Sequence, residues 1–263
     1  MSEGIVTRTR GTIFEIVLNR PEKRNALSNA LLRELDQAVM LATRSSGVRC
    51  VLLRGEGKCF SSGIDVTSFM ELKDIYGEHW IQRGRMITAD IQQILNRLER
   101  LEIPTIALMH GFCLGLGLEL ALACDIRIAS VDLKLGLPET LLGLIPDVGG
   151  TTRLTRLIGP ARAKELIFTG RTIDATTAEG YGLLNKVVPS AELLPAAEAL
   201  ATEISRAAPL AVGMAKRVID GLADNERGFS LEGWAQSQLF GTEDFMHAIK
   251  CFATKEVPVF KGS

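Results

Sequence analysis

The sequence predicts an α/β fold that is followed by a mostly helical C-terminal region. Over the first 190 residues, short segments rich in β-branched residues alternate with segments of helical spacing. This alternation is typical of strands joined by crossover connections. From about residue 191 onward, the apolar residues follow helical spacing almost throughout. We therefore expect a core at 1–190 and a helical C-terminal region at 191–263.

Three segments have the composition of strands, namely residues 12–18, 50–54 and 104–108. Each is followed by a turn and then by a pattern of helical spacing. We expect these helices at 27–43, at 87–98 and at 116–123. Within the first of them, Leu31, Leu35 and Val39 recur every four residues, and Ser28 stands where an N-cap is expected.

Large apolar residues mark the helical C-terminal region, namely Trp234, Leu239, Phe240, Phe245 and Phe252. Such a face either packs on a partner subunit or folds back as a lid over the core. The spacing alone is consistent with both arrangements.

The charge balance excludes a general attraction to polyanions. The 30 Lys and Arg residues nearly balance the 31 Asp and Glu residues, so the net charge is only -1. We therefore expect no binding to nucleic acid or to a membrane surface, because both rely on an excess of positive charge. The chain also lacks the roughly 18 consecutive apolar residues of a membrane-spanning helix.

The five cysteines favour a reducing compartment. They form no CxxC pair, their number is odd, and nothing before them resembles a signal peptide. We therefore expect a cytoplasmic protein.

Several common catalytic motifs are absent from the chain. It contains no HExxH, and with only three histidines a histidine-based metal site would be hard to assemble. It contains no GxSxG, which argues against a Ser-His-Asp hydrolase. The absence of GxGxxG and of GxxxxGK[ST] argues against nicotinamide and P-loop nucleotide binding. We therefore expect no metal and no redox cofactor.

A glycine-rich turn leads from the strand near residue 104 into the apolar helix at 116–123. The free amides at a helix start stabilise negative charge, and glycines let a ligand approach the backbone. A developing enolate oxygen is one such charge. The alternative is that Gly115 and Gly117 only permit close helix packing.

Three carboxylates are candidates for proton transfer. Glu119 lies among leucines and alanines, and burial there is expected to raise its pKa into the range useful for acid–base catalysis. Glu139 and Asp147 follow it in the chain, and two acids in one pocket can divide the roles of acid and base. Glu139 also directly follows Pro138, a common helix start, so the local sequence by itself favours a structural role for it.

Five segments of the chain resemble enoyl-CoA hydratase and its crotonase-superfamily relatives. They are residues 18–27, 60–65, 110–121, 124–127 and 138–154, and they include the stretches FSSGID, CDIR and GGTTRL. They occur in the order and spacing of that family and extend over nearly the whole chain. The resemblance implies a spiral of repeated ββα units and a helical C-terminal region used in trimerisation, giving a homotrimer or a dimer of trimers.

The resemblance also implies a substrate and a site. The substrate would be an acyl-CoA thioester, and CoA would enter as part of it rather than as a cofactor. Its carbonyl oxygen would accept hydrogen bonds from the backbone NH groups of Ile64 and Leu116. Residues next to these amides would shape the binding site, namely Ser62, Gly63, Asp65, Gly115 and Gly117.

In hydratases of this family two glutamates flank the substrate double bond, and both positions are glutamates here. By resemblance, Glu119 would activate water and Glu139 would deliver a proton to the carbon next to the carbonyl. Asp147 departs from this pattern, because dienoyl-CoA isomerases of the superfamily carry aspartate there. We expect a 2-enoyl-CoA hydratase. An enoyl-CoA or dienoyl-CoA isomerase that uses Glu139 and Asp147 is the first alternative, and a non-catalytic acyl-CoA-binding protein is the second.

Overall fold

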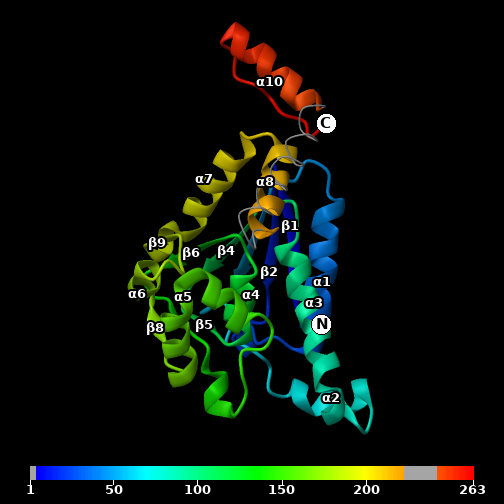
Figure 1. Ribbon diagram of the computed structural model, residues 1–263, viewed down its shortest axis with the longest axis vertical. Helices are drawn as coiled ribbons and strands as arrows, with labels where there is room; N and C mark the ends of the chain where they lie inside the picture. The colour runs from blue at the N-terminus through cyan, green and yellow to red at the C-terminus, as the bar shows by residue number, and fades with distance from the viewer. Residues whose placement is uncertain (1–3, 222–241) are drawn as a thin grey trace.

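The computed structural model describes residues 4–221 and 242–263. It has two sheets with helices on both sides (Figure 1). The strands are β1 Ile5–Arg10, β2 Ile13–Leu18, β3 Cys50–Gly55, β4 Thr105–Met109, β5 Phe112–Leu114, β6 Ile126–Ser130, β7 Lys134–Gly136, β8 Ile173–Asp174 and β9 Lys186–Val188. The α-helices are α1 Asn29–Arg44, α2 Ser68–Tyr76, α3 Gly84–Glu99, α4 Leu116–Leu122, α5 Gly150–Thr169, α6 Ala175–Gly180, α7 Leu193–Ser205, α8 Pro209–Gly221 and α10 Glu243–Thr254. Short 3-10 helices are η1 Pro21–Lys23, η2 Trp80–Arg83, η3 Pro138–Leu142 and η4 Ser190–Glu192.

The larger sheet has six strands in the order β1-β2-β3-β4-β6-β9, and the smaller one has the order β5-β7-β8. The β1–β2 pair is antiparallel, whereas β2, β3, β4, β6 and β9 run parallel to one another. The predicted crossover connections are therefore confirmed, since two parallel neighbouring strands require the chain to return to the same end of the sheet between them.

The larger sheet is buried on both faces, which explains the continuous apolar runs of its central strands. In β3, Val51 and Leu53 pack into the main core, whereas Cys50 and Leu52 face a second cluster that α7 covers. Figure 1 shows α7 on one side of the sheet and α1 and α3 on the other.

The predicted strands correspond to β2, β3 and β4, and the predicted helices to α1, α3 and α4. The N-cap at Ser28 is confirmed, because its hydroxyl accepts a hydrogen bond of 3.2 Å from the Leu31 amide. Leu31, Leu35 and Val39 are all buried, as their spacing predicts.

The C-terminal region is helical in α7, α8 and α10. Of the apolar residues expected to mark it, Trp234, Leu239 and Phe240 lie outside the described residues, and so do the side chains of Phe245 and Phe252. Figure 1 shows α10 beyond one end of the larger sheet, away from the helices that flank it. No helix among the described residues is both long enough and apolar enough to cross a membrane.

Candidate active site

A cavity of about 280 Å³ lies where α3, α4, η3 and the turn before α5 meet. Its apolar wall includes Leu72, Trp80, Ile87, Ile91 and Ile145. Its polar side contains all three predicted carboxylates together with both predicted amide donors, namely Glu119, Glu139, Asp147, Ile64 and Leu116. Residues up to 119 positions apart in the chain, from Asn29 to Val148, thus meet in one cavity.

Glu119 lies on α4, the helix that begins directly after Gly115. Its side chain is only 2% exposed, in agreement with its apolar neighbours in the sequence. Its Oε1 atom accepts hydrogen bonds of 2.8 Å from the amides of Val148 and Gly150. Burial raises the pKa of Glu119 to about 7, the two amides oppose this rise, and the charges of Glu139 and Asp147 add to it.

Glu139 occupies η3, where Pro138 fixes the start of the short helix. Its side chain is half-buried. Its Oε2 atom is buried and has no hydrogen-bond partner in the described part of the chain. Burial raises the pKa of Glu139, and the charge of Asp147 raises it further. A carboxylate left in this state favours the protonated form or a ligand that donates a hydrogen bond.

Asp147 is exposed at the edge of the cavity and is tied to α3. Its Oδ2 atom accepts a hydrogen bond of 2.5 Å from the Thr88 hydroxyl. Its backbone carbonyl accepts one of 2.6 Å from the Gln92 side chain. Asp147 is therefore held at its place by two residues that lie one helical turn apart.

The amides of Ile64 and Leu116 both belong to residues that line the cavity. Neither amide donates a hydrogen bond to any residue within 4–221 or 242–263. The glycines before them approach each other closely, since a Cβ atom added to Gly63 would lie 3.7 Å from the Gly115 Cα atom. Both glycines have a positive φ, +98° for Gly63 and +49° for Gly115. A Cβ atom added to Gly115 would lie 2.8 Å from Glu139 Oε1. The geometry thus leaves two free amide donors beside two carboxylates of raised pKa, a combination that can stabilise an oxyanion while protons move nearby.

The family model described as enoyl-CoA hydratase/isomerase matches residues 8–263. The chain belongs to the enoyl-CoA hydratase/isomerase family. It is 38% identical to the short-chain-enoyl-CoA hydratase of Clostridium acetobutylicum, over 95% of each chain. It is also 38% identical to an enoyl-CoA isomerase/hydratase of Mycosarcoma maydis, over 95% of this chain and 93% of that one.

Solved structures of family members superimpose closely. The enoyl-CoA hydratase of Bacillus anthracis superimposes on this chain with a TM-score of 0.91 and is 37% identical to it. The match covers 99% of this chain and 100% of that one. The expected crotonase-like α/β fold is therefore confirmed, and the protein is an enzyme of the hydratase/isomerase family.

The remaining predicted residues of this family site do not line the cavity themselves. Ser62, Gly63 and Asp65 flank Ile64, and Gly115 and Gly117 flank Leu116. Asp65 accepts hydrogen bonds from the hydroxyl and the amide of Thr67 and pairs with Arg20 at 3.2 Å. The Thr67 hydroxyl is the largest cause of the lowered pKa of Asp65. These contacts shape the segment that presents the Ile64 amide.

Gly117 permits close packing of α4, as the alternative interpretation of the glycine-rich turn predicts. A Cβ atom added there would lie 2.7 Å from the Cβ atom of Ser61. Gly115 instead needs a backbone conformation that few other residues adopt. The two glycines of this family turn therefore have different roles.

Sequence reasoning missed several residues of the site. Thr88, Gln92 and Arg153 hold the turn between η3 and α5, and none of them stands out by composition. Arg153 lies within the GGTTRL segment that carried the family resemblance, which is the one signal that pointed to it.

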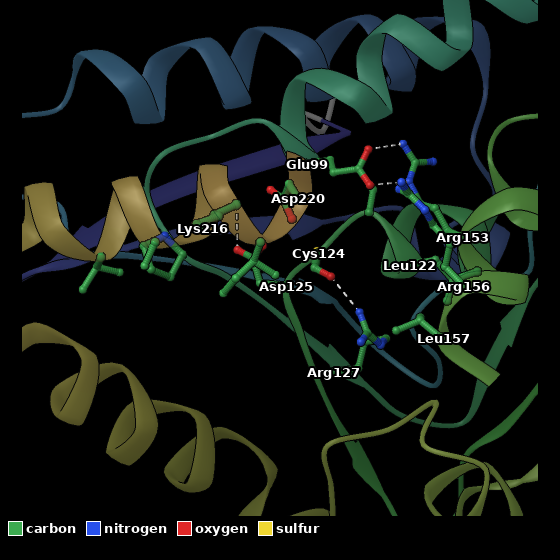
Figure 2. Close-up of a pocket in the computed structure, with 15 residues that line it drawn as sticks. Glu99, Leu122, Cys124, Asp125, Arg127, Arg153, Arg156, Leu157, Lys216 and Asp220 are labelled. Carbon is green, nitrogen blue, oxygen red and sulfur yellow. Dashed lines mark hydrogen bonds and ion pairs between the residues drawn. The ribbon is translucent and has the colours of Figure 1, made fainter. Parts of the chain in front are cut away.

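A second, larger cavity of about 530 Å³ is lined by Arg153 and by residues of α3 and α8 (Figure 2). It contains none of the predicted site residues. Figure 2 shows Arg153 paired with Glu99, and Lys216 paired with Asp125 at 2.7 Å. These charges already have partners within the protein, and the predicted carboxylates and amide donors all line the smaller cavity, so we place the candidate active site there.

Proposed function

We propose that the enzyme catalyses the reversible addition of water to the double bond of a 2-enoyl-CoA thioester, giving 3-hydroxyacyl-CoA. The observation that carries this proposal is the meeting of Glu119 and Glu139 in one cavity with the free amides of Ile64 and Leu116. An isomerase with a single base would require only one of the two glutamates.

The two amides would bind the thioester carbonyl oxygen. As water adds to the substrate, negative charge moves from the double bond onto this oxygen. Donors already aimed at that position stabilise the enolate-like state without reorganisation. Because both donors are backbone groups, side chains at Ile64 and Leu116 are free to shape the cavity instead.

Glu119 would take a proton from water while the water oxygen bonds to C3 of the acyl chain. Glu139 would give its proton to C2, next to the carbonyl. The sum is one water added, and exchange with solvent returns a proton from Glu119 to Glu139 before the next turnover. The reverse sequence dehydrates a 3-hydroxyacyl-CoA.

This scheme needs one proton on the glutamate pair. Glu119, Glu139 and Asp147 repel one another when all are charged, and this repulsion contributes to the raised pKa of Glu119, about 7. Near neutral pH the cluster therefore readily retains a proton, which belongs to the pair rather than to one residue. The substrate determines where it is used.

We further propose that CoA enters only as part of the substrate and that the enzyme works without a metal or redox cofactor. The five cysteines are all free, which supports a cytoplasmic setting. The place of α10 beyond the sheet supports assembly into a homotrimer or a dimer of trimers (Figure 1). Sedimentation equilibrium of the purified protein tests the assembly.

The deciding experiment incubates the pure protein with short and medium 2-enoyl-CoAs, and separately with a 3,5-dienoyl-CoA. The absorbance of the conjugated thioester reports turnover, and mass spectrometry identifies the products. We expect the enoyl-CoAs to become one water heavier. Conversion of the dienoyl substrate alone, without a change of mass, would contradict the proposal.

The second candidate is a dienoyl-CoA or enoyl-CoA isomerase that uses Glu139 and Asp147. It is favoured by one observation, the charge of Asp147 raising the pKa of Glu139. Asp147→Asn separates the two candidates: hydration should change by less than about threefold, since only Glu119 and Glu139 carry protons in the hydratase scheme. A hundredfold or greater loss of dienoyl-CoA isomerisation in this variant would favour the isomerase.

A further inference from the structure

The turn at residues 146–150 supplies both amides that bind Glu119, so the place of this carboxylate depends on what holds the turn. Val148 and Gly150 each donate a hydrogen bond of 2.8 Å to Glu119 Oε1. Between them, Gly149 has φ +103°, and a Cβ atom added there would overlap the Arg153 guanidinium. The turn thus wraps around Arg153, the fourth residue of α5.

Arg153 fastens this turn from behind. Its Nη1 atom donates a hydrogen bond of 3.0 Å to the carbonyl of Val148, the residue whose amide binds Glu119. That carbonyl belongs to the planar peptide group 148–149, which lies between the two peptide groups that carry the amides bound to Glu119, so holding it limits how far either amide can turn away. Only one residue therefore separates the guanidinium from the carboxylate of Glu119.

Arg153 is itself fixed to α3. Its Nε and Nη2 atoms donate to the two oxygens of Glu99 at 3.1 and 2.8 Å, and Nη2 donates to Asn96 Oδ1 at 2.6 Å. Figure 2 shows the paired contacts between the guanidinium and Glu99. The Arg153 side chain is 8% exposed, and a bidentate pair at such burial has a well-defined geometry.

We propose that Arg153 is a positioning residue for water addition, which sets the amides of Val148 and Gly150 so that Glu119 is held toward the reacting double bond. This inference rests on the proposed function, since Glu119 is there the group that activates water. Arg153 is not a catalytic residue, because it lines the second cavity and not the one that contains Glu119.

A purely structural role would predict a different result. Loss of stability alone lowers every activity of the site together. Loss of Glu119 positioning lowers water addition, but it spares reactions that need only Glu139 and the amides of Ile64 and Leu116. One such reaction is the exchange of the C2 hydrogen of butyryl-CoA with D₂O, which requires proton removal and an oxyanion site but no added water.

The test uses Arg153→Met in the full-length protein, which keeps the length of the side chain and removes its donors. We expect hydration of a short 2-enoyl-CoA to fall by roughly 10- to 100-fold in kcat, as for misplacement of a catalytic group. We expect C2 exchange to change by less than about threefold. In a crystal structure of the variant, the amides of Val148 and Gly150 should lie farther from Glu119 Oε1.

The matched control is Arg97→Met on α3, the helix that carries the Arg153 partners Asn96 and Glu99. Arg97 pairs with Asp36 of α1 at 2.7 Å, and its side chain is 43% exposed against 8% for Arg153. Both activities should stay within about twofold of wild type, as for an exposed ion pair. If Arg153→Met does not fold, Glu99→Gln replaces it, because this change weakens the anchor while keeping its shape.

An equal loss of hydration and exchange, or amide distances unchanged in the variant, would overturn the inference. Failure of the proposed function is distinguishable, because wild type itself would then add no water to any enoyl-CoA. In that case the crystal structure of the variant still decides whether Arg153 positions Glu119.

Discussion

The two glutamates of the cavity lie on elements of very different character. Glu119 is part of a buried helix, and one of its carboxylate oxygens accepts hydrogen bonds from two backbone amides. Glu139 is in a short 3-10 helix, is half-buried, and keeps one buried oxygen without a partner in the described residues. Two residues of the same type, facing one cavity, therefore differ in how their charged forms are stabilised.

The fold thus gives two identical side chains different chemical roles. Amide donors stabilise the charged form of Glu119 against its burial, which suits a base that must accept a proton. The unpartnered oxygen of Glu139 suits an acid that holds a proton until substrate arrives. The four changes below test this division.

Glu139→Gln should have the largest effect, because both water addition and C2 exchange need proton transfer at C2. We expect each rate to fall by about 10⁴-fold, the upper end of the range for a general acid–base group. Hydration and exchange assays on the same preparation measure this. Exchange at the wild-type rate would show that another group moves the C2 proton.

Glu119→Gln should separate the two reactions. Hydration is expected to fall by about 10²- to 10³-fold, because no base remains for water, while exchange stays within about tenfold. The ratio of the two rates is the quantity to follow. Equal losses in both would mean that the glutamates act as one unit and are not divided.

The same variant should be more stable than wild type at alkaline pH. The pKa of Glu119 is raised from 4.5 to about 7 in the folded protein. The stability that the protonated side chain contributes is therefore fully present below pH 4.5 and is lost as the pH rises through 7. Glu119→Gln avoids that loss and should gain about 2–3 kcal/mol at pH 8. Urea unfolding at pH 8 and at pH 5 measures the difference, which should shrink at the lower pH.

A pair of glycine changes should disturb one glutamate at a time. An added Cβ would lie 2.8 Å from Glu119 Oε1 in Gly150→Ala and 2.8 Å from Glu139 Oε1 in Gly115→Ala. We expect roughly 10-fold losses, with Gly150→Ala lowering hydration alone and Gly115→Ala lowering both reactions.

Gly180→Ala is the control for this pair, since an added Cβ there meets no atom within 4 Å. It should leave both rates unchanged. A loss of exchange in Gly150→Ala would contradict the separate roles of the two glutamates.

Local sequence determined much of the fold. The period of Leu31, Leu35 and Val39 and the cap at Ser28 identified α1, because helices depend on neighbours three and four positions apart. The apolar run around Glu119 indicated a buried carboxylate. The edge strand β1 was missed because its outer half, with Arg8 and Arg10, is exposed and carries charge.

The short strands β5 and β7 to β9 were also missed. They have two or three residues each, and the pairing of β6 with β9 joins residues that are distant in the chain. Strands of this length have little pattern of their own and are defined by their partners.

Only the tertiary structure decided how the carboxylates are held. The amides that bind Glu119 come from 29 and 31 positions away. Thr88 reaches Asp147 across 59 positions, and Glu99 reaches Arg153 across 54. Local periodicity carries no information about such contacts, because they form only when sheet and helices pack. The sequence thus identified which residues can transfer protons, and the packing of α3 and α5 determined the environment in which each does so.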